Sequence, residues 1–87
     1  MRTWAKLLQD EMKERGETLA DLESNTLSIA AMEVEFDASY GCKEGVPFTA
    51  WTAKTVYFPV CHDGSEWVGS VSRHPDGKPT PHQGGLT

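Results

Sequence analysis

The chain has 87 residues, two cysteines and a formal net charge of −5. A chain of this length forms one small domain with a limited core, which leaves little room for a deep catalytic pocket. Two cysteines are too few for a disulfide framework, and we find neither a secretory hydrophobic region nor an apolar run long enough to span a membrane. We therefore expect a protein of the reducing cytosol that does not enter a membrane.

The excess of negative charge is confined to the N-terminal half. Residues 1–40 hold nine acidic and four basic residues, whereas acids and bases balance in residues 41–87. This asymmetry opposes a phosphate-binding surface in the N-terminal half and favours a partner with a basic surface. The alternative is a solvated acidic face that keeps the protein soluble.

The first predicted element is a helix from the N-cap Thr3 to about Arg15, with Gly16 as the left-handed stop. Apolar residues recur along it at i, i+3, i+4 and i+8, which predicts one apolar stripe. The stripe consists of Trp4, Leu7, Leu8 and Met12. Thr18 with Asp21 then resembles a capping box, which predicts a second, short helix over residues 19–23.

Residues 31–37 (AMEVEFD) fit two patterns. Apolar and acidic residues alternate, which is typical of a strand with one wet face, but Ile29 and Met32 also fit a helical stripe. We favour a strand at the edge of the sheet, where a row of acids discourages edge-to-edge aggregation. That row is Glu33, Glu35 and Asp37.

Residues 47–73 predict a three-stranded antiparallel meander. Asp63-Gly64 fits the two central positions of a type I′ turn, which sets a ladder from His62–Ser65 outward to Val56–Val71. A second turn at Ala53-Lys54 brings in a strand over residues 48–52 and places Trp51 beside Val56. Pro59 then falls opposite Phe48, where the ladder ends and a missing N–H is tolerated.

This register sorts the side chains of the hairpin onto two faces. We expect the more hydrophobic face to pack under the N-terminal helix and the other face to be partly exposed. The predicted core face carries Val56, Phe58, Val60, Trp67, Gly69 and Val71, and the other face carries Thr55, Tyr57, Pro59, Cys61, Glu66, Val68 and Ser70.

The predicted fold class is therefore α+β, with one or two N-terminal helices packed on an antiparallel sheet of three to four strands. Residues 1–73 form the single domain. Residues 74–87 contain three prolines and three glycines but only one hydrophobic residue, Leu86, so we expect an extended or mobile tail.

No pattern indicates a metal, a cofactor or a catalytic residue. Cys42, Cys61 and the three histidines lack metal-ligand spacing, and nothing marks either thiol as an activated nucleophile. Asp63 is explained by the turn, and Glu66 reads as an ordinary exposed strand residue.

The candidate binding residues fall into two sets. The acids Glu33, Glu35 and Asp37 would face a basic partner, and the set Lys54, Tyr57 and Arg73 would offer an aromatic ring and two cations. The alternative for Arg73 is a structural role, in which it caps the sheet by pairing with the acidic half.

Residues 47–75, PFTAWTAKTVYFPVCHDGSEWVGSVSRHP, resemble a family of small phage and prophage proteins built around PFTAWT…VYFPV…YDG-EWVGSVPR-P. His62 stands where that pattern has Tyr, and Ser72 stands where it has Pro. The family is a domain of unknown function without established catalytic residues. The resemblance implies a phage-type accessory protein in the host cytoplasm.

These observations together predict a non-enzymatic accessory protein that binds a host protein with a basic surface. An inhibitor of a nucleic-acid-handling defence complex such as CRISPR fits this description. The alternative is a small nucleic-acid or nucleotide-binding module that uses Lys54, Tyr57 and Arg73.

Overall fold

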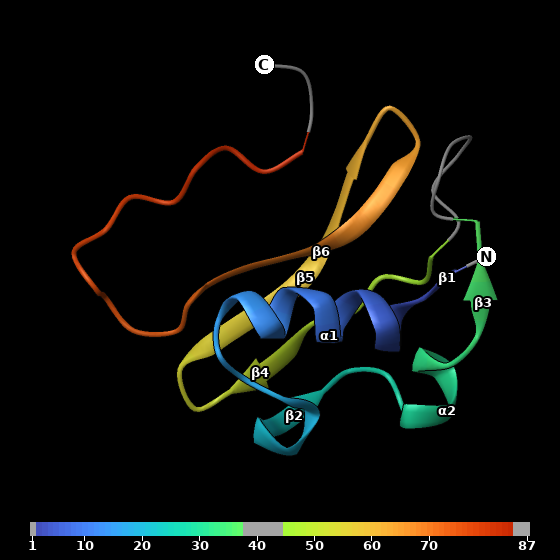
Figure 1. Cartoon of the computed structure of the whole chain (residues 1–87), viewed down its shortest axis with the longest axis horizontal. Coiled ribbons are helices and arrows are strands. Elements are labelled where there is room, and N and C mark those ends of the chain that lie inside the picture. The colour runs from blue at the N-terminus through green and yellow to red at the C-terminus, as the bar shows by residue number, and fades with distance from the viewer. Residues whose placement is uncertain (1, 38–44, 85–87) are drawn as a thin grey trace.

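The computed structural model describes residues 2–37 and 45–84 (Figure 1). Strands β2, β4, β5 and β6 form an antiparallel sheet in that order, and β1 pairs with β3 in a separate two-stranded sheet. The predicted α+β fold, with an N-terminal helix on an antiparallel sheet, is confirmed. The elements are β1 (Arg2–Thr3), α1 (Trp4–Glu14), the 3-10 helix η1 (Leu19–Asp21), β2 (Leu22–Asn25), α2 (Ile29–Met32), β3 (Glu35–Phe36), β4 (Ala50–Thr52), β5 (Thr55–His62) and β6 (Ser65–Ser72).

Helix α1 begins and ends where its sequence predicts. The Thr3 hydroxyl accepts the backbone N–H of Lys6 at 3.1 Å, and Gly16 has a φ of 71°, the left-handed conformation that stops a helix. The whole predicted stripe is buried, and Ala5 is buried with it. This stripe is the helix's contribution to the core.

The strand registers of the meander are also confirmed. In the β5–β6 hairpin, each residue from His62 to Val56 pairs with its predicted partner, and one further pair extends the ladder. Asp63 and Gly64 both have positive φ, as a type I′ turn requires. Strand β4 pairs with β5 in the predicted register and begins at Ala50, so Pro59 lies beyond the end of that pairing.

The assignment of the two hairpin faces is wrong. Helix α1 packs on the face that carries Tyr57 and Val68, which are 0% and 2% exposed. Phe58 is only half-buried on the opposite face, and Trp67 is 37% exposed there. The polar groups of the helix-facing side are satisfied by partners near α1; the Ser70 hydroxyl, for example, donates to a Glu11 carboxylate oxygen at 2.6 Å. Hydrogen bonding across the layers therefore allows the less hydrophobic face to be buried.

The segment after α1 follows the prediction only in part. The predicted capping box of Thr18 and Asp21 is present, but the short helix it opens ends at Asp21. The chain then continues as β2, which pairs with β4 and becomes the fourth strand of the main sheet. Residues 22–25 are therefore one edge strand of that sheet, β6 is the other, and the prediction that residues 31–37 supply an edge strand is wrong.

Residues 29–37 contain both of the structures that the sequence left open. The Ser28 hydroxyl accepts the backbone N–H of Ala31 at 3.1 Å and caps α2, which ends at Met32. The next two-residue strand, β3, pairs with β1 rather than with the main sheet. The acidic alternation of residues 33–37 therefore lies beside the N-terminus of α1.

Trp4 lies at the centre of the core. Its ring contacts those of Phe36 and Phe48, with centroids 4.7 and 5.0 Å apart, and its indole N–H donates to the Val46 carbonyl at 2.9 Å. The partners come from β3 and from the segment that enters β4. One side chain of α1 thus joins parts of the chain that are distant in sequence.

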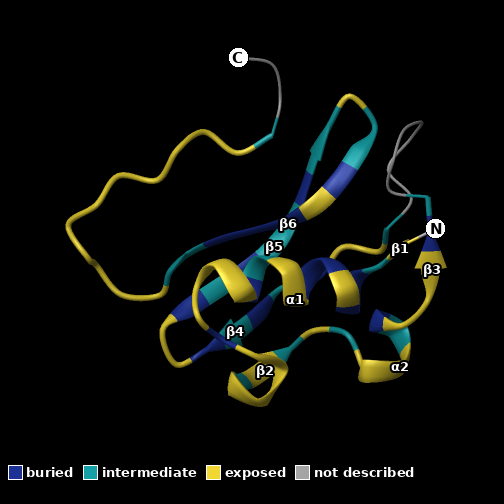
Figure 2. Ribbon diagram, in the orientation of Figure 1, coloured by how far each residue is buried: buried dark blue, intermediate teal, exposed yellow. Residues whose placement is uncertain are grey.

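The described part of the predicted tail has neither helix nor strand. Residues 73–83 are exposed, as the yellow ribbon in Figure 2 shows, and Gly84 is half-buried. Figure 1 shows the segment leaving the end of β6, looping outward and returning toward the β5–β6 hairpin.

Candidate functional site

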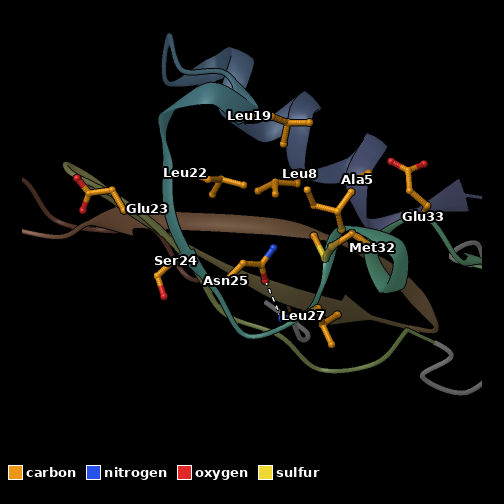
Figure 3. A pocket seen from close by; sticks show the side chains of 11 residues that line it. Ala5, Leu8, Leu19, Leu22, Glu23, Ser24, Asn25, Leu27, Met32 and Glu33 are labelled. Atoms are coloured by element: carbon orange, nitrogen blue, oxygen red, sulfur yellow. Dashed lines mark hydrogen bonds between the residues drawn. The ribbon is translucent and has the colours of Figure 1, made fainter.

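A cleft of about 360 Å³ lies between α1, β2 and α2 (Figure 3). Its floor is apolar and is formed by Leu8, Leu22, Leu27 and Met32. Leu8 and Met32 are also part of the buried core, so the floor is held by the fold itself. An apolar hollow of this size accommodates one or two large side chains of a binding partner.

The wall of the cleft is fixed by hydrogen bonds in the turn that connects β2 to α2. The Asn25 side-chain oxygen accepts the backbone N–H of Leu27 at 3.0 Å, which turns the chain directly after β2. Two hydrogen bonds join Thr26 to Thr49. The Thr26 backbone N–H donates to the Thr49 carbonyl, and the Thr26 hydroxyl accepts the Thr49 backbone N–H. The turn is therefore anchored to the segment that precedes β4.

Two apolar side chains at the mouth of the cleft are exposed. Ile29, the first residue of α2, is 83% exposed, and Leu19 of η1 is 41% exposed. Isolated exposed apolar residues need no explanation, but two of them bordering an apolar hollow extend it into an apolar surface. Contiguous surfaces of this kind mark interaction sites.

The rim of the cleft is acidic. Figure 3 shows Glu23 and Glu33 at its two ends, with the apolar side chains between them. Both residues are exposed, and Glu23 also pairs with Arg73 at 3.1 Å. Negative charge around an apolar hollow favours an apolar anchor with basic neighbours.

The six residues predicted from the sequence do not form one site. Glu33 borders the cleft, Glu35 is exposed on β3, and Asp37 is half-buried just after that strand. Lys54 is exposed in the β4–β5 turn, and its carbonyl accepts the backbone N–H of Arg73 at 2.8 Å. The β4–β5 turn and β3 lie at opposite sides of the molecule in Figure 1.

Tyr57 belongs to the core, and its predicted position on an exposed face is wrong. Its hydroxyl donates to Glu17 at 2.5 Å, and both side chains are buried. Burial and the neighbouring Glu17 carboxylate raise the pKa of Tyr57 well above its ordinary value. Burial also acts to raise the pKa of Glu17, but hydrogen bonds from Tyr57, Thr52 and Thr55 outweigh it, and the pKa ends below its ordinary value.

Arg73 has the structural role that the sequence offered as an alternative. Its guanidinium donates to Glu23 at 3.1 Å and to the Thr52 carbonyl at 3.0 Å. It thereby ties the end of β6 to the end of β4 and to β2. Lys54, the other cation of the predicted second set, is exposed in the β4–β5 turn.

Glu66 was predicted to be an exposed strand residue, but it is buried. It is 6% exposed, and its carboxylate accepts the backbone N–H of Gly45 at 3.2 Å. Cys61 is half-buried in β5, whereas Cys42 lies outside the described residues.

Within residues 2–37 and 45–84, no three His, Cys, Asp or Glu side chains gather closely enough to hold a metal ion. In the same residues, no helix combines the length and the apolar character needed to cross a bilayer.

Sequence reasoning missed the apolar part of the cleft. Leu19, Leu22, Leu27 and Ile29 fall in a stretch where neither helical nor strand periodicity persists. The available signal was four large aliphatic residues within eleven positions, for which the predicted elements offered no common apolar face. Comparison with protein-family models, with curated proteins and with solved structures finds no match.

Proposed function

We propose that the protein is a non-enzymatic binding protein that docks a basic segment of a host protein in the cleft between α1, β2 and α2. The observation that carries this proposal is an apolar cleft whose mouth leaves Ile29 83% exposed and whose rim bears Glu23 and Glu33. An apolar side chain of the partner buries against Leu22 and Met32. A Lys or Arg beside that side chain pairs with the rim carboxylates.

The charge distribution supports a partner that normally holds nucleic acid. Residues 1–40, which include α1 and the cleft, carry nine acids against four bases. A protein groove that binds a phosphate backbone is lined with Lys and Arg, so an acidic surface complements it. Together with the resemblance of residues 47–75 to phage proteins, this charge makes a host defence complex such as CRISPR the candidate target.

Direct nucleic-acid binding is less well supported. Of the three residues that would carry it, Tyr57 is buried, and the guanidinium of Arg73 is bonded to Glu23 and Thr52. Lys54 alone offers too little positive charge to outweigh a net charge of −5.

The test uses two synthetic helical peptides, one of leucine, lysine and alanine and one in which glutamate replaces lysine. Binding to the ¹⁵N-labelled protein is followed by NMR. We expect the basic peptide to bind and to shift the signals of Leu22, Leu27 and Met32, while the acidic peptide does not. Shifts that avoid the cleft, or equal binding of both peptides, would overturn the proposal.

Matched variants separate the cleft from general charge attraction. Ile29→Ser removes the more exposed of the two apolar side chains at the mouth, and Val34→Ser removes an exposed apolar side chain that does not border the cleft. Glu33→Lys reverses the charge of the rim, and Glu14→Lys reverses an exposed charge elsewhere. We expect at least a tenfold loss of affinity for Ile29→Ser and Glu33→Lys, and less than a threefold change for the two controls.

The same four variants test the host target. A host protein captured by the wild-type chain supports the proposal only if Ile29→Ser and Glu33→Lys lose it while both control variants retain it. Retention of the wild-type chain on DNA or RNA, weakening with salt, would instead support the nucleic-acid module.

A further inference from the structure

The outer face of the main sheet, opposite α1, is apolar. Val56, Phe58 and Val71 are half-buried there, and Trp67 is 37% exposed. Val60 lies on the same face and is only 6% exposed, yet it is not part of the core cluster beneath α1. Something on the outer side must therefore cover Val60.

The cover is a C-terminal segment, residues 83–84. Gly84 lies so close to β5 that a Cβ on it would be 2.8 Å from Val60 Cγ1 and 2.8 Å from the Cys61 carbonyl oxygen. The Gln83 side chain lies over β6, with Oε1 2.8 Å from the position of a Cβ on Gly69. Glycine at positions 69 and 84 thus allows the segment to lie directly on the sheet, because a side chain at either position would push it away.

We infer that the outer face of the sheet is a second interaction surface and that residues 83–84 of the same chain are its occupant, as a releasable cover. The residues between β6 and the cover are exposed, so the conformational entropy lost when they are ordered is offset by little buried surface. The side chains of Asp76 and Gln83 bond locally, to the Lys78 N–H and the Pro81 carbonyl. Release of the cover exposes Val60 between Phe58 and Trp67.

This surface is independent of the cleft. The cleft lies on the side of α1, whereas the cover lies on the opposite face of the sheet, so the failure of either proposal leaves the other standing. Any partner of the outer face must displace the C-terminal segment, which makes the segment a competitor for that face.

The full-length chain offers a matched pair of variants. Gly84→Ala places a methyl group against Cys61 and Val60 at a φ of 64°. Gly77→Ala introduces the same kind of backbone strain at a φ of 74°, but no atom lies within 4 Å of the added methyl group. Neither glycine lies in a helix or a strand, so neither substitution disturbs the sheet.

The measurements are the NMR signals of the Val60 methyl groups and the fluorescence of the apolar dye ANS. In the wild-type chain we expect a nuclear Overhauser contact between a Val60 methyl group and Gly84. Gly84→Ala should abolish this contact and raise ANS fluorescence at least twofold, while Gly77→Ala leaves both unchanged. Absence of the contact in the wild-type chain, or the same ANS fluorescence in both variants, would overturn the inference.

Discussion

The hydroxyl of Tyr57 in β5 donates to the carboxylate of Glu17 at 2.5 Å, and these two buried residues are 40 positions apart in the sequence. Thr52 and Thr55 also bond to this carboxylate. The bonds keep Glu17 ionised although burial disfavours its charge. The turn after α1 is therefore attached to the sheet by a polar cluster of Glu17, Tyr57, Thr52 and Thr55, placed inside an otherwise apolar interface.

Removing the tyrosine hydroxyl should destabilise the fold. In Tyr57→Phe the ring remains in the core, but the buried Glu17 carboxylate loses a hydrogen-bond donor, so we expect a loss of roughly 1–3 kcal/mol in the free energy of unfolding. Urea denaturation followed by circular dichroism measures this loss. Glu14→Gln, which changes an exposed acid near the end of α1, serves as the control and should change stability by less than about 0.5 kcal/mol. A Tyr57→Phe variant as stable as this control would contradict the role of the polar cluster.

The polar cluster also makes stability depend on pH at both ends of the scale. The pKa of Glu17 is lower in the folded state, so its contribution is present above about pH 4.5 and is lost as the pH falls through the folded-state pKa. The pKa of Tyr57 is higher in the folded state, so its contribution is complete below the ordinary tyrosine pKa of about 10 and is lost as the pH rises above it.

Urea midpoints between about pH 2 and 11 should therefore fall at both ends for the wild-type chain. Glu17→Gln should flatten the acid side, and Tyr57→Phe should flatten the alkaline side. If the urea midpoint of Glu17→Gln falls with acid as steeply as that of the wild-type chain, other carboxylates determine the loss of stability at low pH.

The hairpin register was predictable because it is set locally. Two turn residues with positive φ fix which residue of β5 faces which residue of β6, and no distant contact is needed to specify this. The same holds for α1, whose cap, stripe and glycine stop all lie within sixteen positions of the N-terminus.

The face that meets the helix was not predictable in this way. A count of hydrophobic side chains favours the face of Phe58 and Trp67 as the one that packs under the helix, because such a count takes the Tyr57 and Ser70 hydroxyls as a sign of exposure. In the structure these hydroxyls donate to Glu17 and Glu11, and the sequence contains no sign of such distant pairings. The cleft was missed for a related reason, since it depends on how β2 and α2 pack beside the first half of α1.

Gly45 is required for close packing against Trp4. A Cβ at position 45 would overlap the indole ring of Trp4, and this ring cannot move easily because it contacts Phe36 and Phe48. We expect Gly45→Ala to cost roughly 1–3 kcal/mol, as overpacking of a core does. Gly16→Ala is the control, because its methyl group meets nothing within 4 Å and costs about 1 kcal/mol through its positive φ alone.

A double variant tests the steric cause directly. Trp4→Phe replaces the indole with a smaller ring. In this background Gly45→Ala should reduce the free energy of unfolding by less than it does in the wild-type chain, and the difference is the coupling free energy of a double-mutant cycle. Additive losses in urea denaturation would show that Gly45 acts through its backbone and not through Trp4.

The acids on the rim of the cleft should matter more for binding than for stability. Glu33 is exposed, and the ion pair between Glu23 and Arg73 joins two exposed side chains, a geometry that contributes at most about 1 kcal/mol. Arg73 keeps its bond to the Thr52 carbonyl when Glu23 is neutralised. We therefore expect Glu23→Gln and Glu33→Gln each to change the free energy of unfolding by less than about 0.5 kcal/mol.

Each substitution should nevertheless weaken the binding of the basic peptide several-fold. The loss should be larger at low salt, because an unscreened attraction is lost. Titration of the peptide at two salt concentrations measures this effect. Equal affinities for the wild-type chain and both variants would show that the rim is not part of the binding site. A large loss of stability would show that these acids serve the fold.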